Sequence, residues 1–566
     1  MHRVSNGVAM PEIDYTRYYR FAELVEALEG FAAEYPDLIS LQSIGKSYEG
    51  RDLWLATVTN VATGGPREKP AFWVDANIHA SEVTGAMAGL HLIDTLLKGY
   101  GNDAECTRLL DRTTFYILPR FNPDGAERAL TTPYVVRSSV RPYPYAERID
   151  GLYQEDINGD GIILQMRLVD PNGDWRVSEH DPRVMVKRKP YEIGGTYYRI
   201  LPEGLIQNYD GVNIKLSRAV EGLDINRNFP VDWRPEAEQY GAGPYPTSEP
   251  EIRAVVQFIV DHPEIHSGLT YHTYSGVLLR PYGDRADDQM NLHDLDVFKA
   301  LGKHGTELTG WPSVSVYHDF RYHPKDVITG VFDDWVYDHL GMFAWTVEFW
   351  DLVGSAGIKD RKFIEWFKEH PEEDDLKIMQ WVDEHGEGLC FYDWTAFEHP
   401  QLGPVEIGGW HPMYAFRNPP PAKLLETIAP VTQFALAHAA IAPFTTISSF
   451  ELEALGDNVY RLQAVVQNEG YLPSYGSQKG RERKATLPLE ALLNLPEGSS
   501  LKLGQAKTTI GDLEGRSGRV SFFGFSNGST TDRTKVEWVV HVPNPGVIEL
   551  TIQGGRGGIA RAKLEI

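Results

Sequence analysis

Hydrophobic residues in the first 440 positions follow two spacings that alternate along the chain. Some segments repeat apolar side chains at helical spacing, and others are short apolar runs typical of buried strands. The helical segments are 21–31, 86–97 and 430–440, and the strand-like runs are 53–58, 71–74 and 114–118. Because helices and strands alternate, we expect an α/β domain over residues 1–440.

After Pro443 the pattern changes to an alternation of hydrophobic and polar residues. Such runs, separated by Gly, Asn and Pro, cover residues 450–453, 459–466, 520–525, 536–542, 547–552 and 559–564. A period of two residues predicts short antiparallel strands with one buried face. We expect an all-β sandwich over residues 445–566, and we favour a packing or folding accessory over a recognition module because nothing in it identifies a ligand.

The composition is that of a soluble enzyme with more than one domain. The 566 residues are 42% hydrophobic and 23% charged, and the formal net charge of -25 argues against nucleic acid as a partner. No apolar run reaches the length of a membrane span, so we expect no membrane partner. The start, Met1 to Asn6, lacks the apolar core of a signal peptide, which predicts a cytoplasmic protein, or an exported one if a leader has been removed. Two cysteines, Cys106 and Cys390, exclude a disulfide framework.

Polar side chains stand at the ends of three strand-like runs. His79 and Glu82 follow the first run, His272 ends the second, and Glu348 ends the apolar run at 342–347. A catalytic zinc ion takes three protein ligands and keeps a position open for water, and two imidazoles with one carboxylate are a common set. The spacing of His79 and Glu82 is frequent by chance, so the prediction depends on the segments that accompany it.

Five segments in a fixed order make the prediction specific. They contain His79 with Glu82, Asn122 to Gly125, Asp224 to Phe229, His272 to Ser275, and Asp334 with Glu348. In this order the chain resembles the zinc metallocarboxypeptidases, the family of the pancreatic carboxypeptidases A and B, over roughly residues 15–440. The resemblance implies a mixed, twisted central sheet flanked by helices. It also implies one catalytic zinc ion held by His79, Glu82 and His272.

The resemblance assigns further roles at the site. Glu348 matches the general base that takes a proton from the attacking water and passes it to the leaving amine. Asn226 and Arg227 match the pair that binds the free α-carboxylate of the substrate. Arg137 has the family's spacing for the arginine that stabilises the oxyanion, and Arg141 is the nearby alternative.

Two aspartates have two interpretations each. Asp224 resembles the aspartate that orients a ligand histidine from behind, and a turn or capping aspartate explains it equally well. Asp333 stands where carboxypeptidase B has an aspartate at the base of its specificity pocket, which would select C-terminal Lys or Arg. The alternative for Asp333 is a solvated side chain beside a helix start.

The chain departs from the digestive enzymes at two positions. Ser81 stands where those enzymes place an arginine between the first two ligands, so one contact to the substrate is missing. The tyrosine that caps the bound substrate should fall near Asp326, and Tyr322 substitutes for it only if the loop differs. The zinc chemistry of the digestive enzymes is therefore expected in this chain with more support than their affinity for the terminal residue of the substrate.

Residues 142–222, approximately, form an insertion relative to the digestive enzymes. Within it, Asp156, Asn158 and Asp160 have the alternate spacing of the first half of a calcium loop. The glutamate expected at the twelfth place is absent, so a calcium site would need Asp170 or Asp174 to complete it. We favour an Asp/Asn/Gly turn without metal.

Taken together, these patterns predict a zinc-dependent carboxypeptidase that hydrolyses the last bond of a peptide with a free C-terminal carboxylate, with a preference for C-terminal Lys or Arg if Asp333 lies in the pocket. One alternative is a specialised amidohydrolase or cell-wall peptide hydrolase of the same fold. Another is a catalytically silent zinc-binding or peptide-binding protein. The sequence leaves the oligomeric state open.

Overall fold

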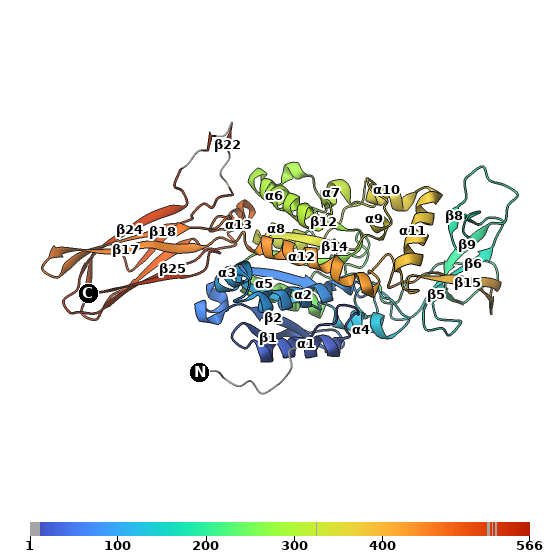
Figure 1. Cartoon of the computed structure of the whole chain (residues 1–566), viewed down its shortest axis with the longest axis horizontal. Coiled ribbons are helices and arrows are strands. Elements are labelled where there is room, and N and C mark those ends of the chain that lie inside the picture. The colour runs from blue at the N-terminus through green and yellow to red at the C-terminus, as the bar shows by residue number, and fades with distance from the viewer. Residues whose placement is uncertain (1–11, 324, 518–520, 523–524, 527–528) are drawn as a thin grey trace.

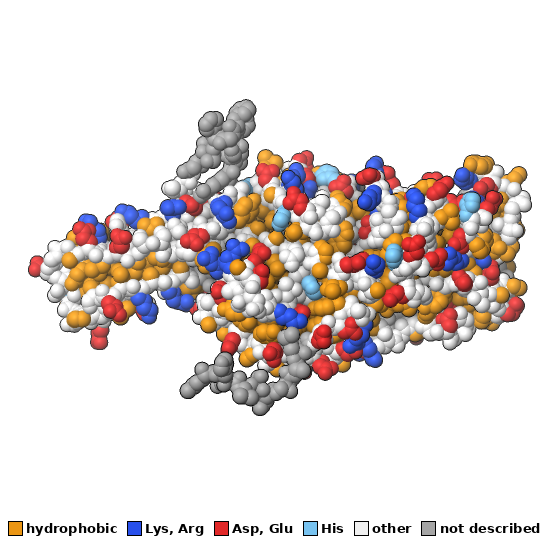
Figure 2. Space-filling view, viewed as in Figure 1, with side chains coloured by type: hydrophobic (Ala, Val, Ile, Leu, Met, Phe, Trp, Pro, Cys, Tyr) orange, Lys and Arg blue, Asp and Glu red, His pale blue; other side chains and the backbone are white. Residues whose placement is uncertain are grey.

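The structure is a computed structural model that describes residues 12–323, 325–517, 521–522, 525–526 and 529–566. Figure 1 shows a β-domain at one end of the long axis, a helix-covered sheet in the middle and a second β region at the other end. Acidic and basic side chains are interspersed over the face drawn in Figure 2. Within the described ranges, no helix has both the length and the apolar character needed to cross a bilayer.

The central sheet has eight strands in the order β1-β2-β4-β3-β11-β14-β12-β13. They are β1 (Ile39–Lys46), β2 (Asp52–Val58), β3 (Ala71–Ala76), β4 (Thr114–Leu118), β11 (Ile265–Thr273), β12 (Val277–Arg280), β13 (Ser313–Ser315) and β14 (Phe343–Phe349). Strand β3 is parallel to β4 and β11, and β11 is parallel to β14, whereas β1, β2 and β12 make antiparallel pairs. The expected mixed sheet is confirmed.

Helices cover both faces of this sheet, which is why the inner strands β3, β4 and β11 are buried along their whole length. Along β3, Phe72 and Val74 pack into one hydrophobic core, while Ala71 and Trp73 pack into the other. The first core includes residues of α1 (Phe21–Glu34), α2 (Thr84–Gly99), α3 (Ala104–Arg112), α6 (Leu292–Thr309) and α12 (Leu424–Ala439), and the second includes residues of α5 (Pro250–Asp261) and α8 (Phe332–Leu340). The α/β fold expected from the sequence is confirmed, although the closing helix α12 begins before Pro430.

Shorter helices connect these elements. They are α4 (Pro123–Thr131), α7 (Val316–Asp319), α9 (Leu352–Ser355), α10 (Phe363–Lys368) and α11 (Glu372–His385). Asn122 caps α4, because its side chain accepts a hydrogen bond from the backbone N–H of Gly125 at 3.0 Å.

The insertion contributes most of a second sheet, of six strands in the order β15-β16-β6-β9-β7-β8. The strands are β6 (Gln165–Val169), β7 (Trp175–Val177), β8 (Met185–Lys187), β9 (Tyr198–Pro202), β15 (Phe391–His399) and β16 (Gly403–Trp410), and β5 (Gly151–Gln154) pairs separately with β10 (Gly204–Gln207). Strands β15 and β16 come from a segment far beyond the insertion. The insertion and residues 391–410 therefore form one structural unit.

The structure does not support the calcium site. The carboxylate of Asp156 accepts the backbone N–H groups of Gly159 at 2.7 Å and Gly161 at 2.9 Å. Asp160 accepts the N–H of Ile162 at 2.9 Å. Among the described residues, the cluster suited to a metal ion lies elsewhere, around His79. These carboxylates stabilise a turn, as the favoured interpretation expected.

The C-terminal region is a β-sandwich, as expected. Its two four-stranded sheets have the orders β17-β18-β24-β20 and β21-β19-β25-β26, and side chains from both share one hydrophobic core. The strands are β17 (Thr445–Gly456), β18 (Val459–Asn468), β19 (Leu489–Asn494), β20 (Ser500–Leu503), β21 (Lys507–Gly511), β24 (Arg533–His541), β25 (Val547–Gln553) and β26 (Ala560–Glu565). Of the strand expected over 520–525, positions 520, 523 and 524 lie outside the described residues, and β22 (Ser521–Phe522) pairs with β23 (Phe525–Ser526).

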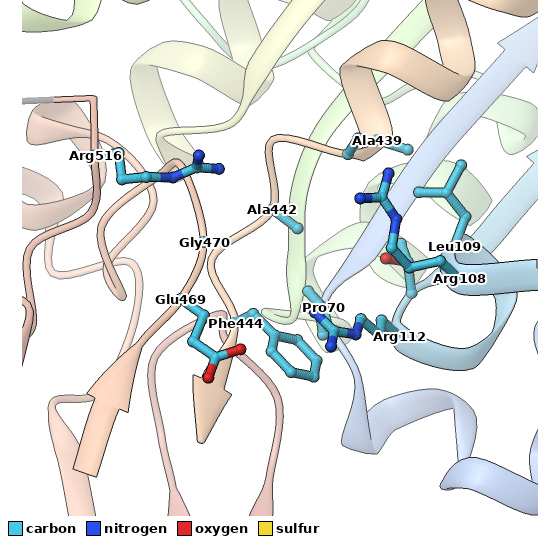
Figure 3. Close-up of a pocket in the computed structure, with 12 residues that line it drawn as sticks. Pro70, Arg108, Leu109, Arg112, Ala439, Ala442, Phe444, Glu469, Gly470 and Arg516 are labelled. Atoms are coloured by element: carbon cyan, nitrogen blue, oxygen red, sulfur yellow. The ribbon is translucent and has the colours of Figure 1, made fainter. Parts of the chain in front are cut away.

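A crevice separates the sandwich from the central domain on one side (Figure 3). Pro70 and Arg112 line it from the central domain, and Phe444 and Glu469 line it from the sandwich. The guanidinium of Arg112 stacks over the Phe444 ring at 4.6 Å. None of the site residues predicted from the sequence lines this crevice.

Candidate active site

The loop that follows β3 presents the first two predicted ligands. Strand β3 ends at Ala76, and the next residue, Asn77, adopts a positive φ of 62°. The Asn77 side chain donates hydrogen bonds to the carbonyl oxygens of His79 at 2.7 Å and Ala80 at 3.2 Å. These hydrogen bonds shape the loop between β3 and α2. His79 and Glu82 both lie in this loop and are buried.

The third ligand and the predicted base come from the two neighbouring strands. Strand β11 lies between β3 and β14, and all three run parallel. In this register His272 pairs directly with Glu348, and Tyr271 pairs with Ala76. Carboxyl ends of adjacent parallel strands meet at one edge of a sheet, which explains why residues distant in sequence converge here.

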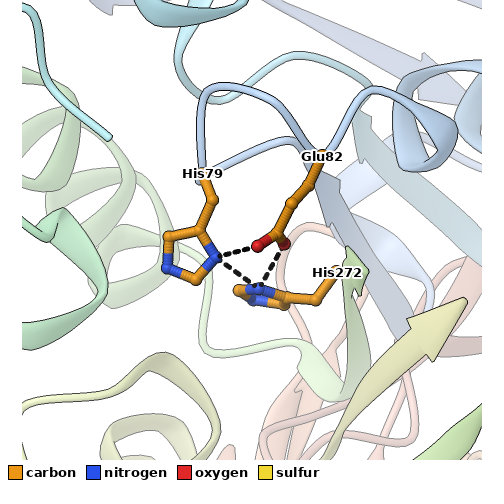
Figure 4. Close-up of side chains that lie close together, drawn as sticks. All are labelled: His79, Glu82 and His272. Atoms are coloured by element: carbon orange, nitrogen blue, oxygen red, sulfur yellow. Dashed lines mark hydrogen bonds and ion pairs between the residues drawn. The ribbon is translucent and has the colours of Figure 1, made fainter. Parts of the chain in front are cut away.

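Three ligand atoms converge in Figure 4. His79 Nδ1 lies 3.0 Å from Glu82 Oε1 and 3.0 Å from His272 Nδ1, and His272 Nδ1 lies 3.2 Å from Glu82 Oε2. All three side chains are buried. Tetrahedral zinc with bonds of about 2.05 Å holds its ligand atoms roughly 3.3 Å apart, so the spacing suits that ion.

Hydrogen bonds behind the two rings set their tautomers. The Nε2 atom of His79 lies 3.1 Å from Asp224 Oδ1, which can only accept, so Nε2 carries the proton. The hydroxyl of Thr270 donates to Asp75 at 2.7 Å and thereby accepts from Nε2 of His272 at 3.3 Å. Both Nδ1 atoms therefore present lone pairs to each other.

Two lone pairs 3.0 Å apart repel unless a cation lies between them. Burial also lowers the pKa of His272 to about 4, so its ring is neutral, as a metal ligand must be. Burial alone would raise the pKa of Glu82, but the adjacent His79 and His272 hold it well below its usual range. Two imidazoles and one carboxylate fit zinc, the metal that the sequence predicts.

Glu348 faces the same cavity as His79 and His272. Its Oε2 atom is buried and has no hydrogen-bond partner. Burial raises the pKa of Glu348 well above its usual range, and the nearby negative charge of Glu82 raises it further. A carboxylate with a spare oxygen and a raised pKa beside the ligands has the properties of a general base.

Arg137, and not Arg141, lies at the site. Arg137 donates from Nε to Asp224 Oδ2 at 3.0 Å and from Nη1 to Glu82 Oε1 at 3.1 Å. Arg141 instead makes a bidentate pair with Glu249, at 3.0 and 2.6 Å. The Arg137 side chain is 43% exposed, so part of its guanidinium faces the cavity and remains available to a substrate oxygen.

Asp224 performs both tasks considered for it. One carboxylate oxygen accepts a hydrogen bond from His79 Nε2. The same oxygen caps a short helical turn, because it also accepts the N–H of Asn226 at 3.0 Å. The other oxygen receives Arg137. The same residue thus orients a ligand ring and starts the turn that carries Asn226 and Arg227.

Asn226, Arg227 and Asp333 line the cavity beside the ligands. Asp333 is 3% exposed, and its Oδ2 atom has no hydrogen-bond partner, so the alternative of a solvated aspartate is wrong. Burial raises the pKa of Asp333 to about 6, although hydrogen bonds, including one with Thr346, lower the pKa in part. An unpartnered buried carboxylate is suited to receive a cationic group.

Tyr322 also lines this cavity, whereas Asp326 does not. The ring is 60% exposed, and the nearby carboxylate of Glu348 contributes to a raised pKa of Tyr322, after the effect of burial. The loop therefore does place a tyrosine at the cavity, four positions before the one that the family spacing indicates. The substitution considered for Tyr322 is compatible with the structure.

Sequence reasoning missed Arg417. Its Nη1 atom donates to Ser81 Oγ at 2.6 Å, so a guanidinium reaches the position between the first two ligands from a distant segment. Asn418 reinforces the contact by donating to the Ser81 carbonyl at 2.7 Å. No local motif marks Arg417, because its partner lies 336 positions earlier.

Comparison with known proteins agrees with this geometry. A model of the zinc carboxypeptidase family matches residues 24–356, and a domain of unknown function (DUF8731) matches residues 445–565. The chain belongs to the zinc carboxypeptidase family.

Three similar proteins illustrate the relationship. Carboxypeptidase A2 of Rattus norvegicus is 26% identical over 331 residues, which are 57% of this chain and 60% of that protein. Carboxypeptidase B of Astacus astacus is 24% identical over 353 residues, which are 61% of this chain and 90% of that protein. A solved structure, that of thrombin activatable fibrinolysis inhibitor, has a TM-score of 0.43 and 18% identity, with 75% of this chain and 74% of that one covered. The chain thus spans only 60% of the first relative's length.

Proposed function

We propose that this protein is a zinc-dependent carboxypeptidase that removes the C-terminal residue of peptides, with C-terminal Lys or Arg preferred. The observation that carries the proposal is the convergence of His79, Glu82 and His272 beside a cavity that His79 and His272 line together with Arg227 and Asp333. Family membership supports the reaction class. The peptide substrate and its preferred terminal residue belong to the proposal.

Substrate binding begins at Arg227. Its guanidinium lines the cavity and is only 15% exposed, so it offers a buried, permanent positive charge to the terminal carboxylate. The side-chain oxygen of Asn226 accepts the N–H of Phe332 at 3.1 Å, which leaves its NH₂ group to donate to the substrate. An internal peptide bond has no carboxylate to meet this pair, so the cavity favours chain ends.

The chemical step depends on five side chains of this protein. His79, Glu82 and His272 would hold the metal, and a bound zinc ion supplies polarisation of the scissile carbonyl and an acidified water. Glu348 accepts the proton of the attacking water and returns it to the leaving amine. Arg137 donates hydrogen bonds to the oxyanion of the tetrahedral intermediate.

The terminal side chain would extend toward Asp333. Lysine or arginine would pair with this buried carboxylate, whereas leucine would leave it without a partner. A polar group left unpaired in a buried site costs about 1–3 kcal/mol, which corresponds to roughly a tenfold to hundredfold preference.

Metal analysis together with a Glu348→Gln variant tests the proposal. We expect about one zinc ion per chain in both proteins, because Glu348 is not a ligand. The kcat of the variant should fall by at least about a thousandfold, because the amide cannot accept the water's proton. Full activity in the variant would remove Glu348 from the mechanism. Failure of the wild type to hydrolyse any member of a C-terminal peptide library would instead favour a silent binding protein.

A further inference from the structure

A groove of about 620 Å³ lies beside the catalytic cavity and is formed largely by segments outside the central sheet. Strands β6 and β9 of the insertion contribute Gln165 and Ile200, and strand β16 ends in it at Trp410. Helix α10 contributes Phe367. Ligand sites commonly measure roughly 300–1,000 Å³, so the groove can hold more than one residue of a peptide.

The groove begins where the catalytic cavity ends. Tyr274 lines the groove and follows the ligand His272 by two positions. Arg417 lines it as well, and donates to Ser81, between the ligands His79 and Glu82. Among the described residues, no side chain lines both spaces, and the groove meets the ligand-bearing segments at Tyr274 and Arg417.

This order determines which part of a substrate enters the groove. The terminal carboxylate and side chain occupy the cavity at Arg227 and Asp333, and the scissile carbonyl lies at the metal ligands. The cavity, at about 70 Å³, is much smaller than the groove, at about 620 Å³, so the residues that precede the scissile bond extend out of the cavity. Those residues must leave the site along the surface where Tyr274 and Arg417 lie.

Aromatic rings dominate the groove near this exit. Phe367 lies 5.7 Å from Tyr274 and 6.4 Å from Phe416, and Trp410 lies 5.0 Å from Phe416, measured between ring centroids. Phe367 is 40% exposed although it belongs to this cluster. A partly exposed set of rings offers edge and face contacts to another large apolar side chain.

We propose that this groove binds the segment of a peptide substrate that precedes the scissile bond, with a large apolar or aromatic side chain seated against Phe367 and Trp410. Arg417 would donate to backbone carbonyl oxygens of that segment, because Ser81 occupies only one of its nitrogen atoms. The inference rests on the proposed function, and it makes the insertion a determinant of specificity.

Peptides with one fixed C-terminal residue test the groove. One series lengthens the peptide from two to six residues, and another exchanges Ala for Phe or Trp at each position upstream of the scissile bond. We expect kcat/KM to rise about tenfold for the best aromatic peptide over its alanine counterpart, because burial of a large apolar side chain gains that order of free energy. In Phe367→Ala and Ile200→Ala this ratio should fall to near one.

A matched control uses the same insertion. Ile193 is 86% exposed and does not line the groove, so Ile193→Ala should keep the wild-type ratio. Equal cleavage of aromatic and alanine peptides by the wild type would overturn the proposal. An aromatic preference that survives in both Phe367→Ala and Ile200→Ala would overturn it as well.

Calorimetric binding of the same peptides to the zinc-loaded wild type and to Glu348→Gln separates this inference from the proposed function. If no peptide is hydrolysed but aromatic peptides bind about tenfold more tightly, the proposed function fails and the groove stands. If peptides are hydrolysed but upstream residues change neither binding nor rate, the groove proposal is contradicted and the proposed function remains supported.

Discussion

Two all-β regions are attached to the same helix-covered sheet, and they meet it in different ways. The insertion sheet contributes walls to the groove beside the active site. Within the part of the C-terminal sandwich that the structure describes, no residue lines the catalytic cavity or the groove. The side-chain contacts that join each β region to the central domain differ as well. This difference predicts which region unfolds together with the central domain, as part of one folding unit.

Partly exposed ion pairs join the insertion to helix α11. Arg183 makes a bidentate pair with Asp383, with both nitrogen–oxygen distances 2.7 Å, and Asp383 is 50% exposed. Arg176 pairs with Glu372 at 3.2 Å. Solvent screens such pairs, so each stabilises the joint by less than about 1 kcal/mol.

Buried groups join the sandwich to the end of helix α8. Arg556 is 2% exposed and donates to the carbonyl oxygens of Leu340 and Gly341. Asp294 is fully buried and accepts the first N–H groups of helix α13 (Gln478–Arg483), from Gln478 and Lys479 at 2.9 Å each. These bonds form in low dielectric, where loss of one partner is costly.

Gly341 shows how closely the sandwich approaches. Helix α8 ends there with φ 64°, and a Cβ on Gly341 would lie 2.2 Å from the Cα of Gly480 in α13. Helix α8 also carries Asp333 at its other end. Helix α8 thus links the joint with the sandwich to Asp333, while helix α6 contributes Asp294 to the same joint, and these packing contacts support the role of a packing accessory.

The largest effect should follow from Arg556→Met. The substitution keeps an apolar stem but removes the donor to the Leu340 carbonyl and one of two donors to the Gly341 carbonyl, which Ser477 still serves, so the free energy of unfolding should fall by about 2 kcal/mol. Denaturant titration measures this loss. Arg561→Met is the control, because Arg561 pairs with Glu68 across the same joint and is 51% exposed, and its loss should stay below about 1 kcal/mol. Equal losses in the two variants would contradict the buried joint.

The next effect concerns the other end of α8. Asp333→Asn should reduce the kcat/KM ratio of C-terminal Lys over Leu peptides by about tenfold, because the amide cannot pair with a cation. Thermal stability should not fall, since burial raises the pKa of Asp333 and the ionised form is disfavoured there. An unchanged ratio would remove Asp333 from the specificity pocket. A changed ratio in Arg556→Met would show that the sandwich also influences specificity.

The pH dependence of this ratio sharpens the test. The pKa of Asp333 is raised to about 6, so the carboxyl is neutral below that pH and charged above it. The Lys over Leu ratio of the wild type should therefore rise as the pH increases through about 6, and the ratio of Asp333→Asn should stay flat. The use of a ratio cancels the titration of Glu348, which affects both substrates equally. A ratio that falls with increasing pH would contradict the charge pairing.

The sequence allowed the ligand set and the fold class to be predicted, because His79 and Glu82 follow one strand-like run, His272 ends another, and all three occur in the order of a known family. It could not predict Arg417, since the contact with Ser81 joins segments 336 positions apart and depends on the folded chain. It also could not predict the pairing of β16 with β6, because the sequence does not indicate that a late hairpin completes the insertion sheet. The burial of Asp333 stayed open because aspartate is equally common at a solvated helix start.

The smallest effect should follow from Arg183→Ala. Loss of the partly exposed pairs with Asp181 and Asp383 should lower the free energy of unfolding by about 1 kcal/mol or less, because solvent replaces much of the lost contact. Hydrogen exchange should nevertheless become faster in strands β6 and β9 than in the central sheet, since a weak joint permits local motion. A decrease in the free energy of unfolding as large as that in Arg556→Met would contradict the difference between the two joints. It would show that the insertion unfolds together with the central domain. A small loss with unchanged aromatic selectivity would show that the groove keeps its shape without this ion pair.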